Sequence, residues 1–325
     1  LTTSSAASDV YKRQTFKNEY SNIPVIMMTA HSDLETTVDA FENGAWDYIA
    51  KPFDLNDAIS KISKALEEKK IRAKKISSEE EIHLERGKIV GKSPAMQDLF
   101  NSIGKLSHSS STVLLVGESG TGKELVAQAI YEHSDRADKK LISLNMADIP
   151  IELLESELFG YEKGAFTGAD HKKIGRFEQA HKATLFLDEI GDMPYETQTR
   201  ILRVLSSGEF YRIGGSDPVK VDVRIIAATN QNLNEKVRSG AFREDLFHRL
   251  NVIRIALPPL RDRKEDIPML TNYFFEKFSE EVKSESKFLS SEVEELFAKL
   301  IWPGNVLQLQ NLSLIHISEP TRPYW

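Results

Sequence analysis

A phosphate-binding loop between a strand and a helix constrains the fold of this chain more than any other feature. Thr112–Val116 is an apolar run that predicts a buried strand, and Gly117–Lys123 follows it with the sequence G-E-S-G-T-G-K. From Glu124 onward, apolar residues recur at helical spacing. Glycines let backbone N–H groups close around phosphate oxygens, and a helix N-terminus adds positive potential. The strand–loop–helix context therefore predicts an α/β fold with a parallel sheet and a nucleoside triphosphate site.

The loop itself supplies the candidate nucleotide-binding residues. Lys123 is expected to reach the β- and γ-phosphates of ATP. Glu124 occupies the position where Ser or Thr usually binds Mg²⁺, so the ion must depend more on other ligands. The candidate residues are Gly117, Glu118, Ser119, Gly120, Thr121, Gly122, Lys123 and Glu124.

An acidic pair follows a second buried strand. Ala183–Leu187 reads A-T-L-F-L, and Asp188 and Glu189 come directly after it. We expect Asp188 to hold Mg²⁺, through water, and Glu189 to polarise the attacking water. General-base help of this kind contributes about 10²- to 10⁴-fold to a rate. Without the strand and the phosphate loop, the pair would be ordinary surface charge.

Gly164–Ala169, with the sequence G-A-F-T-G-A, lies between these two motifs. Its glycines allow backbone freedom, and an apolar Phe166 in such a segment is available to touch another molecule. An ordinary glycine-rich turn is the alternative. With Tyr161, Glu162 and Lys163 before it, the hexapeptide resembles the contact loop of bacterial sigma-54-dependent transcription activators, which are enhancer-binding ATPases of the AAA+ class. The resemblance implies that Gly164, Ala165, Phe166, Thr167, Gly168 and Ala169 contact sigma-54.

The same resemblance assigns further residues around the nucleotide. It places Ile89 and Val90 near the adenine and explains Glu124, because the activator group carries Glu there. It also implies that Asn145, at the end of the predicted strand Leu141–Asn145, bonds the catalytic Glu189 and couples nucleotide state to the contact loop. A simple cap at the strand end is the alternative for Asn145.

Two other segments match the family near the γ-phosphate. Thr229 and Asn230, at the end of the predicted strand Val223–Asn230, resemble the first sensor of the γ-phosphate. Arg243 and Arg249 resemble arginine fingers contributed to a neighbour's active site, where such residues contribute about 10³- to 10⁵-fold in other phosphoryl-transfer enzymes. A local ion pair with one of the acidic residues after Arg243 is the alternative.

The C-terminal part predicts a helical lid. Pro258 and Pro259 mark a boundary, helical patterns continue through Leu300, and Trp302–Val306 resembles the final lid motif of the family. The family continues with an arginine, the second sensor, where this chain has Leu307. A nearby acidic residue of the family is replaced by Gln310, and the helix-turn-helix domain that binds DNA is expected to be absent.

The N-terminal part resembles the C-terminal half of a flavodoxin-like receiver domain of two-component systems. Short apolar runs at residues 24–28 and 46–50 alternate with helical patterns, which indicates a parallel sheet. The resemblance makes Thr29 the switch hydroxyl and Lys51 the lysine that contacts the phosphate. The phosphoacceptor aspartate would come earlier, and Asp9 is too close to Thr29 to serve. We therefore expect this fragment not to be phosphorylated.

The expected organisation has six parts: a non-native tail (1–13), a partial receiver domain (14–67), a helical linker (68–88), the AAA+ sigma-54 interaction ATPase domain (89–257), a truncated helical lid (258–312) and a second non-native tail (313–325). A 4-3-4-3 spacing of mostly apolar residues begins in the receiver segment and continues into the linker, which predicts either a lone helix or a short seam that pairs two protomers, although Lys69 and Ala73 are poor seam residues. The residues of this spacing are Leu55, Ile59, Ile62, Leu66, Lys69, Ala73 and Ile76.

Composition excludes several classes of protein. The net charge of −7 argues against a nucleic-acid binder, and the absence of cysteine excludes disulfides and thiolate metal sites. No run approaches the roughly 18 apolar residues of a membrane span, and nothing resembles a secretory signal. We therefore expect a cytoplasmic protein with no membrane partner.

Together with these features, the resemblance to sigma-54 activators implies an ATPase, with ATP and Mg²⁺ as cofactors, that remodels the sigma-54 RNA polymerase holoenzyme to start transcription. It would be part of a two-component response regulator and would form a hexameric or heptameric ring, with a dimer as the inactive state. Two alternatives stay open: a generic AAA+ chaperone that remodels other proteins, and a remnant impaired by Leu307 and its missing lid.

Overall fold

The computed structural model describes residues 25–29, 38, 41, 45, 47–55, 58–59, 61–62, 89–282 and 291–318. The chain divides into two compact units, Leu1–Glu81 and Ile82–Trp325, which we describe separately. The predicted linker, residues 68–88, and the seam residues Leu66, Lys69, Ala73 and Ile76 lie outside the described residues.

The first unit contains a parallel pair of strands. β1 (Ile26–Thr29) pairs with β2 (Asp47–Ala50), so that Thr29 lies opposite Ala50. Tyr48 of β2 is buried, and its carbonyl accepts a hydrogen bond from Lys61 Nζ at 3.0 Å. Both strands and their parallel direction confirm the pattern read from the sequence.

The second unit is built on a five-stranded sheet in the order β11-β3-β10-β7-β4. All four strand pairings are parallel. Every residue of β10 is buried, as are most of β3 and β7, which explains why these strands read as continuous apolar runs. The predicted parallel sheet is confirmed. The strands are β3 (Val113–Val116), β4 (Leu141–Asn145), β7 (Thr184–Asp188), β10 (Arg224–Thr229) and β11 (Ile253–Ala256).

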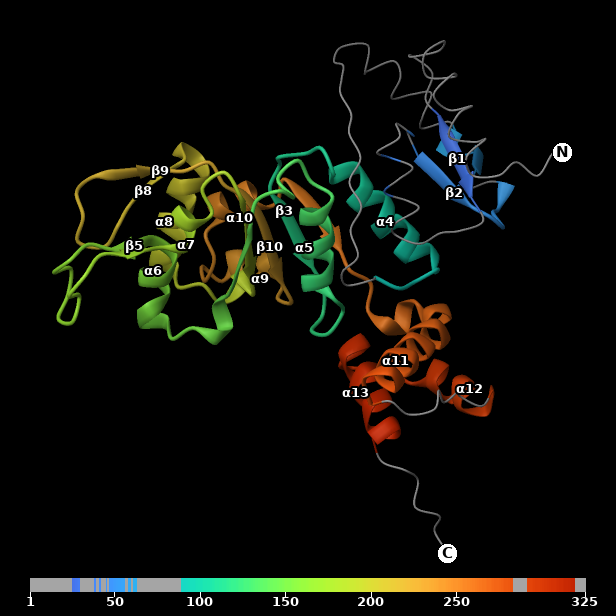
Figure 1. Ribbon diagram of the computed structural model, residues 1–325. Coiled ribbons are helices and arrows are strands. Elements are labelled where there is room, and N and C mark those ends of the chain that lie inside the picture. Colours follow the sequence, from blue (N-terminus) through green and yellow to red (C-terminus); the bar gives the residue numbers. More distant parts are fainter. Residues whose placement is uncertain are drawn as a thin grey trace, which may run out of the picture. The chain divides into compact units, whose positions relative to one another are not determined.

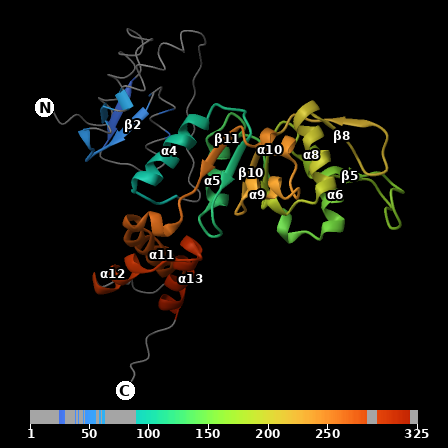
Figure 2. The same cartoon turned by 180° about the vertical axis from the view of Figure 1, so that it is seen from behind.

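Helices and short turns connect these strands (Figures 1 and 2). Local chemistry fixes several of their ends: Ser93 caps the first helix, Asn232 caps the helix after β10, and Gly208, at φ 69°, ends the helix after β7. The helices are α4 (Pro94–Leu106), α5 (Lys123–Glu132), α6 (Ile151–Phe159), α7 (Arg176–Gln179), α8 (Tyr195–Ser207), α9 (Leu233–Arg238) and α10 (Glu244–Leu250), with 3₁₀ turns η1 (Met146–Asp148) and η2 (Ile190–Asp192).

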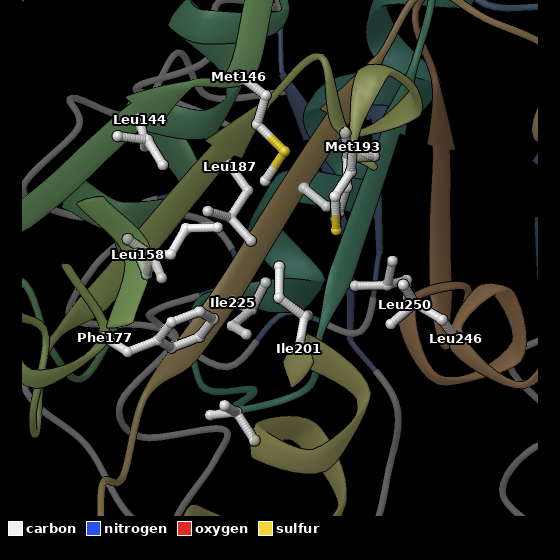
Figure 3. Packing of buried hydrophobic residues seen from close by; sticks show 14 of the residues in the cluster. Leu144, Met146, Leu158, Phe177, Leu187, Met193, Ile201, Ile225, Leu246 and Leu250 are labelled. Atoms are coloured by element: carbon white, nitrogen blue, oxygen red, sulfur yellow. The ribbon is translucent and has the colours of Figure 1, made fainter. Parts of the chain in front are cut away.

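The main core lies between the sheet and helices α6, α7, α8 and α10 (Figure 3). Phe177 of α7 is fully buried and stacks on Phe159 at a ring-centroid distance of 5.5 Å. Leu187 of β7 and Ile225 of β10 supply the sheet side of the same cluster. This packing fixes the carboxyl ends of the strands, where the functional residues lie.

Two antiparallel hairpins extend from this part of the domain. β5 (Gly160–Tyr161) pairs with β6 (Lys173–Ile174), and β8 (Glu209–Tyr211) pairs with β9 (Pro218–Lys220). Gly160 has φ 70°, and a Cβ there would lie 2.2 Å from the carbonyl oxygen of Lys173, so only glycine fits at this crossing. The first hairpin carries the segment Gly164–Ala169.

A helical lid follows β11, as predicted (Figure 1). It consists of η3 (Leu260–Asp262), η4 (Lys264–Asp266), α11 (Ile267–Val282), α12 (Ser291–Lys299) and α13 (Asn305–Ser318). Its own apolar cluster includes Phe274, Phe297 and Trp302, and the Trp302 indole donates to the Phe297 carbonyl at 2.8 Å.

The last helix continues past the boundary expected at residue 312. α13 ends at Ser318, and the buried Ser313 donates its hydroxyl proton to the Leu309 carbonyl at 2.9 Å. No helix within the described residues is long and apolar enough to cross a membrane.

Candidate functional site

The phosphate-binding loop joins β3 to α5, as its sequence requires. Gly120 and Gly122 adopt φ values of 75° and 101°, which favour glycine, and nothing lies within 4 Å of a Cβ placed on Gly122. Gly122 is the N-cap of α5 and makes no side-chain cap. The first turn of α5 therefore has backbone donors available to an anion.

Lys123 folds back over the loop that precedes it. Its Nζ donates to the carbonyl oxygens of Gly117 at 3.1 Å and Glu118 at 3.4 Å, and lies 3.6 Å from Glu189 Oε1. Only 7% of its side chain is exposed. A buried ammonium requires anionic or carbonyl partners, and phosphate oxygens would supply stronger ones.

The acidic pair lies at the carboxyl end of β7. Asp188 accepts a hydrogen bond from Glu189 N at 2.9 Å through one carboxylate oxygen. Glu189 has φ 50°, a conformation that costs a non-glycine residue of order 1–3 kcal/mol and is concentrated at functional sites. Its Oε2 accepts from Asn230 N at 3.1 Å, while Oε1 faces Lys123. The structure thus brings together Lys123, Glu189 and Asn230.

Asn145 lies beside this acidic pair. The strand register places Asn145 opposite Asp188, and the Asn145 side chain accepts a hydrogen bond from Ala147 N at 3.0 Å. This bond is the strand-end cap that the sequence offered as an alternative. No hydrogen bond joins Asn145 to Glu189, both of which are described. A role for Asn145 as a switch stays a prediction.

Thr229 and Asn230 end β10 next to the loop. The Thr229 carbonyl accepts from Gly117 N at 3.2 Å, and its buried hydroxyl oxygen accepts from Gln231 N at 3.1 Å. Asn230 is exposed and gives its backbone N–H to Glu189. A cavity of about 470 Å³ adjoins these residues and is lined by Gly117, Asn230 and Arg261, among others.

Arg243 and Arg249 lie on the surface at the two ends of α10. The Arg243 guanidinium makes a bidentate pair with Asp245 at 2.7 and 3.0 Å, and it holds the pKa of that carboxyl below its usual range. Arg249 is exposed and donates to the Leu205 carbonyl at 3.0 and 3.1 Å. The local ion pair that the sequence offered as the alternative is therefore present for Arg243. Participation of either arginine in a neighbouring site stays a prediction.

The lid rests directly on the phosphate-binding loop. The Gly120 carbonyl accepts hydrogen bonds from Val306 N at 3.0 Å and Leu307 N at 3.3 Å, at the start of α13. A Cβ on Gly120 would lie 2.3 Å from the Gly304 carbonyl oxygen, so only glycine allows this approach. Leu307, the residue in the second-sensor position, is therefore beside the loop with 52% of its surface exposed.

Sequence reasoning missed three lid residues that contact the loop. Arg261 binds Glu118, Asn305 binds Glu118 and Ser119, and the buried Arg263 donates to the Thr121 carbonyl at 3.1 Å. For Arg261 and Arg263, the only available signal was the charge density of the segment after the proline pair, which alone predicts a solvated turn. Asn305 lies in the lid motif Trp302–Val306, which indicated the lid but not this contact.

The segment expected to face the adenine is also tied to the lid. Ile89 is buried, and Val90 packs against the lid cluster. Shortly after Val90 in the chain, the backbone N–H groups of Lys92 and Ser93 donate hydrogen bonds to Asp266 of the lid, at 2.7 and 2.8 Å. The structure places this segment next to the lid, and a role for Ile89 and Val90 near the adenine stays a prediction.

The segment Gly164–Ala169 forms a tight loop at the end of the first hairpin. Gly164 N donates to the Ala169 carbonyl at 2.8 Å, and no atom lies within 4 Å of a Cβ placed on Gly164 or Gly168. Phe166 is 47% exposed, and its ring contacts Tyr161 edge-on at a centroid distance of 4.9 Å. An exposed aromatic ring at the tip of such a loop is available to a partner.

The two receiver residues occupy the carboxyl ends of paired strands. Thr29 ends β1, and Lys51 follows β2 directly, with an exposed side chain and a cis peptide bond to Pro52. Because Thr29 pairs with Ala50, the backbones of Thr29 and Lys51 lie close together at one edge of the sheet. Their roles as switch and phosphate contact stay predictions.

The fold and the site together define a P-loop NTPase of the AAA+ class. Residues 89–256 match the Sigma-54 interaction domain, residues 261–315 match an AAA+ ATPase lid domain, and residues 12–63 match a response regulator receiver domain. The chain belongs to the family of sigma-54 activators defined by the first of these domains. The matched ranges agree with a receiver segment followed by an ATPase domain and its lid.

Similar proteins support this assignment. The chain is 56% identical over 295 residues to the DNA-binding transcriptional regulator NtrC of Escherichia coli K12, and 47% identical over 296 residues to NtrC of Rhizobium meliloti. Each match covers 91% of this chain, which spans 62% and 60% of those two relatives. The crystal structure of NtrX from Brucella abortus in complex with ADP is 36% identical, with a TM-score of 0.67, over 99% of this chain and 70% of that one.

Proposed function

We propose that this chain hydrolyses ATP to ADP and phosphate and uses the reaction to remodel the sigma-54 RNA polymerase holoenzyme, as part of a two-component response regulator. The observation that carries the proposal is the position of the Glu189 carboxylate, between Lys123 Nζ and Asn230 N at the carboxyl edge of the sheet. A carboxylate beside a phosphate-binding lysine is suitably placed to orient water toward a γ-phosphate.

The residues of the loop divide the chemistry between them. Lys123 would exchange its carbonyl partners for the β- and γ-phosphate oxygens, and the N-terminus of α5 would bind phosphate through backbone N–H groups. Glu189 would accept a hydrogen bond from the attacking water and draw its proton away from the phosphorus. Asn230, next to Glu189, is suited to sense the γ-phosphate.

Mg²⁺ fits the carboxylate at the end of β7. Asp188 has one oxygen bonded to Glu189 N, is partly exposed, and is a hard oxygen donor of the kind Mg²⁺ prefers. When bound, the ion would neutralise charge on the phosphates. Within the described residues no group of three or more His, Cys, Asp or Glu side chains gathers to hold a metal, so phosphates and water would complete the coordination.

Assembly into a ring of six or seven subunits would complete the site. The exposed Arg249 and the partly exposed Arg243 are suited to reach a neighbour's γ-phosphate, once Arg243 leaves Asp245. The inactive form would be a dimer. The receiver segment, through Thr29 and Lys51, would regulate this transition, and the protein would act in the cytoplasm.

The loop Gly164–Ala169 favours the activator over a generic chaperone. Its exposed Phe166 lies on a separate hairpin, outside the nucleotide site, and the family of the chain is defined by sigma-54 interaction. Contact with DNA would need a helix-turn-helix domain in addition to the receiver segment, the ATPase domain and the lid.

Two substitutions test the proposed chemistry. Lys123→Ala should abolish nucleotide binding, because the lysine contacts ground-state phosphates, whereas Glu189→Ala should retain binding and lose about 10²- to 10⁴-fold in turnover. Nucleotide affinity and steady-state phosphate release measure the two effects. Asp98→Ala, an exposed carboxylate on α4, is the matched control and should leave both unchanged. Turnover near the unmodified rate in Glu189→Ala would remove this residue from the mechanism.

A further inference from the structure

Glu118, in the phosphate-binding loop, is bound on its outer side by the lid. Its carboxylate accepts two hydrogen bonds from the Arg261 guanidinium, at 2.6 and 2.8 Å, and a third from Asn305 Nδ2 at 3.2 Å. Paired N–H groups on one carboxylate form the strong, directional arrangement of arginine and carboxylate. These partners, Arg261 first, lower the pKa of Glu118 to about 2, so the carboxylate is ionised at neutral pH.

Asn305 joins three parts of the lid and loop. Its side-chain oxygen accepts from Leu260 N at 2.8 Å at the start of η3, and Nδ2 donates to the Ser119 carbonyl at 3.0 Å as well as to Glu118. Asn305 is completely buried and begins α13 with φ 50°. A buried amide with all these partners is difficult to replace, because each lost bond leaves a polar group unsatisfied.

The backbone of Glu118 also contacts the phosphate-binding lysine, Lys123. The Glu118 carbonyl accepts a hydrogen bond from Lys123 Nζ, while the Glu118 side chain is held by the lid. The same side chain and Arg261 line the cavity beside Gly117 and Asn230. The contact therefore lies at the edge of the nucleotide site.

We propose that Arg261 and Asn305 are positioning residues that act through Glu118 to hold the phosphate-binding loop in the conformation that presents Lys123 to the phosphates. The inference rests on the proposed ATPase function. The lid contacts keep the loop ordered before nucleotide binds. Nucleotide binding then loses less conformational entropy in the loop, which favours affinity. Loss of the contact should weaken nucleotide binding more than it slows the chemical step.

A simple surface ion pair is the competing explanation. The side chains of Arg261 and Glu118 are 38% and 43% exposed, and exposed pairs contribute little on their own. An ordinary pair would change stability slightly and leave nucleotide affinity unaltered. Affinity, therefore, and not stability, distinguishes the two explanations.

A double-mutant cycle in the complete chain tests the proposal. The variants are Glu118→Gln, Arg261→Gln and the two combined, measured for ADP affinity by titration calorimetry and for KM and kcat in ATP hydrolysis. Each single substitution should weaken ADP binding and raise KM about three- to tenfold, with kcat changed less than about twofold. The double variant should resemble the singles, because both remove the same contact.

Two controls make the result specific. Lys264→Gln removes an exposed cation from the neighbouring turn, for which the described residues supply no ion pair, and should change neither constant. Arg261→Lys retains the charge but loses the two parallel N–H donors of the guanidinium, so it should give an intermediate affinity for ADP. A graded effect of this kind would show that the losses in the glutamine variants do not come from misfolding.

The outcomes separate this inference from the proposed function. Additive single effects, or lowered thermal stability with unchanged ADP affinity, would overturn the positioning role. If the unmodified chain binds ADP but does not hydrolyse ATP, the proposed ATPase function is rejected. The ADP affinities of the double-mutant cycle would still test the positioning role. If the unmodified chain binds no ADP, both ideas are rejected.

Discussion

Leu307→Arg should increase the catalytic efficiency of this chain. Leu307 lies at the first turn of α13, where its N–H bonds the Gly120 carbonyl of the phosphate-binding loop at 3.3 Å. With half of its side chain exposed, it has room for a longer replacement, and Leu to Arg costs a helix little. An arginine here starts beside the phosphate site.

The size of the gain follows from the strength of the new bond. A hydrogen bond to a charged group contributes about 1.5–3 kcal/mol, and each 1.4 kcal/mol changes an equilibrium or rate about tenfold. Because the position is half exposed, we take the lower end and expect about a tenfold rise in kcat/KM for ATP. Glu118 should not capture the new guanidinium, since Arg261 and Asn305 already bind it.

The assay is steady-state ATP hydrolysis at matched protein concentration, with Leu307→Gln as the control. Glutamine is polar but carries no charge, so it should give no gain. Equal kcat/KM for the arginine variant and the unmodified chain would refute the reasoning. It would mean that another lid residue supplies the contact, or that none is needed.

Three further predictions concern the loop, the ring and pH. Phe166→Ala should leave ATP turnover within a few-fold but abolish binding to sigma-54, measured with a phosphate transition-state mimic. The control Ile301→Ala, at an exposed residue of the lid, should retain both activities. Parallel loss of both activities in Phe166→Ala would mean that the loop has only a structural role. Turnover should rise faster than linearly with protein concentration, and mixing Arg249→Ala with Glu189→Ala should restore some activity; mixed rings without restoration would exclude action in trans. Because the pKa of Glu118 is lowered to about 2, its contribution to stability should be complete above about pH 5 and decline as pH falls from 4.5 toward 2. The difference in melting temperature between the unmodified chain and Glu118→Gln should therefore shrink over this range, and a constant difference would contradict the assignment.

The sheet could be predicted from sequence because its strands are short apolar runs that end at functional residues. Asp188 ends β7 and Glu189 follows it directly, and Gly120 and Gly122 adopt the positive φ values that their loop requires. Thr229 ends β10 beside the loop for the same reason: parallel strands bring their carboxyl ends to one edge.

Contacts between distant segments could not be predicted in this way. Glu118 and Arg261 are separated by 143 positions, and no periodicity relates them. The local environment of Asn145 depends on whether its amide bonds Ala147 or another group, which residue type alone does not decide. The pairing of Arg243 with Asp245 is local and could be anticipated, because two positions along the chain are sufficient for contact at a helix start.

The shared hydrogen bonds at Gly120 also have a consequence for folding cooperativity. A helix begins with N–H groups that its own turns cannot satisfy, and two of those in α13 are satisfied by a carbonyl from the phosphate-binding loop. The phosphate-binding loop thus stabilises the start of the lid helix, and the lid and the sheet domain should melt in one calorimetric transition. A nucleotide that stabilises the loop should raise the melting temperature of the lid by the same amount as that of the sheet.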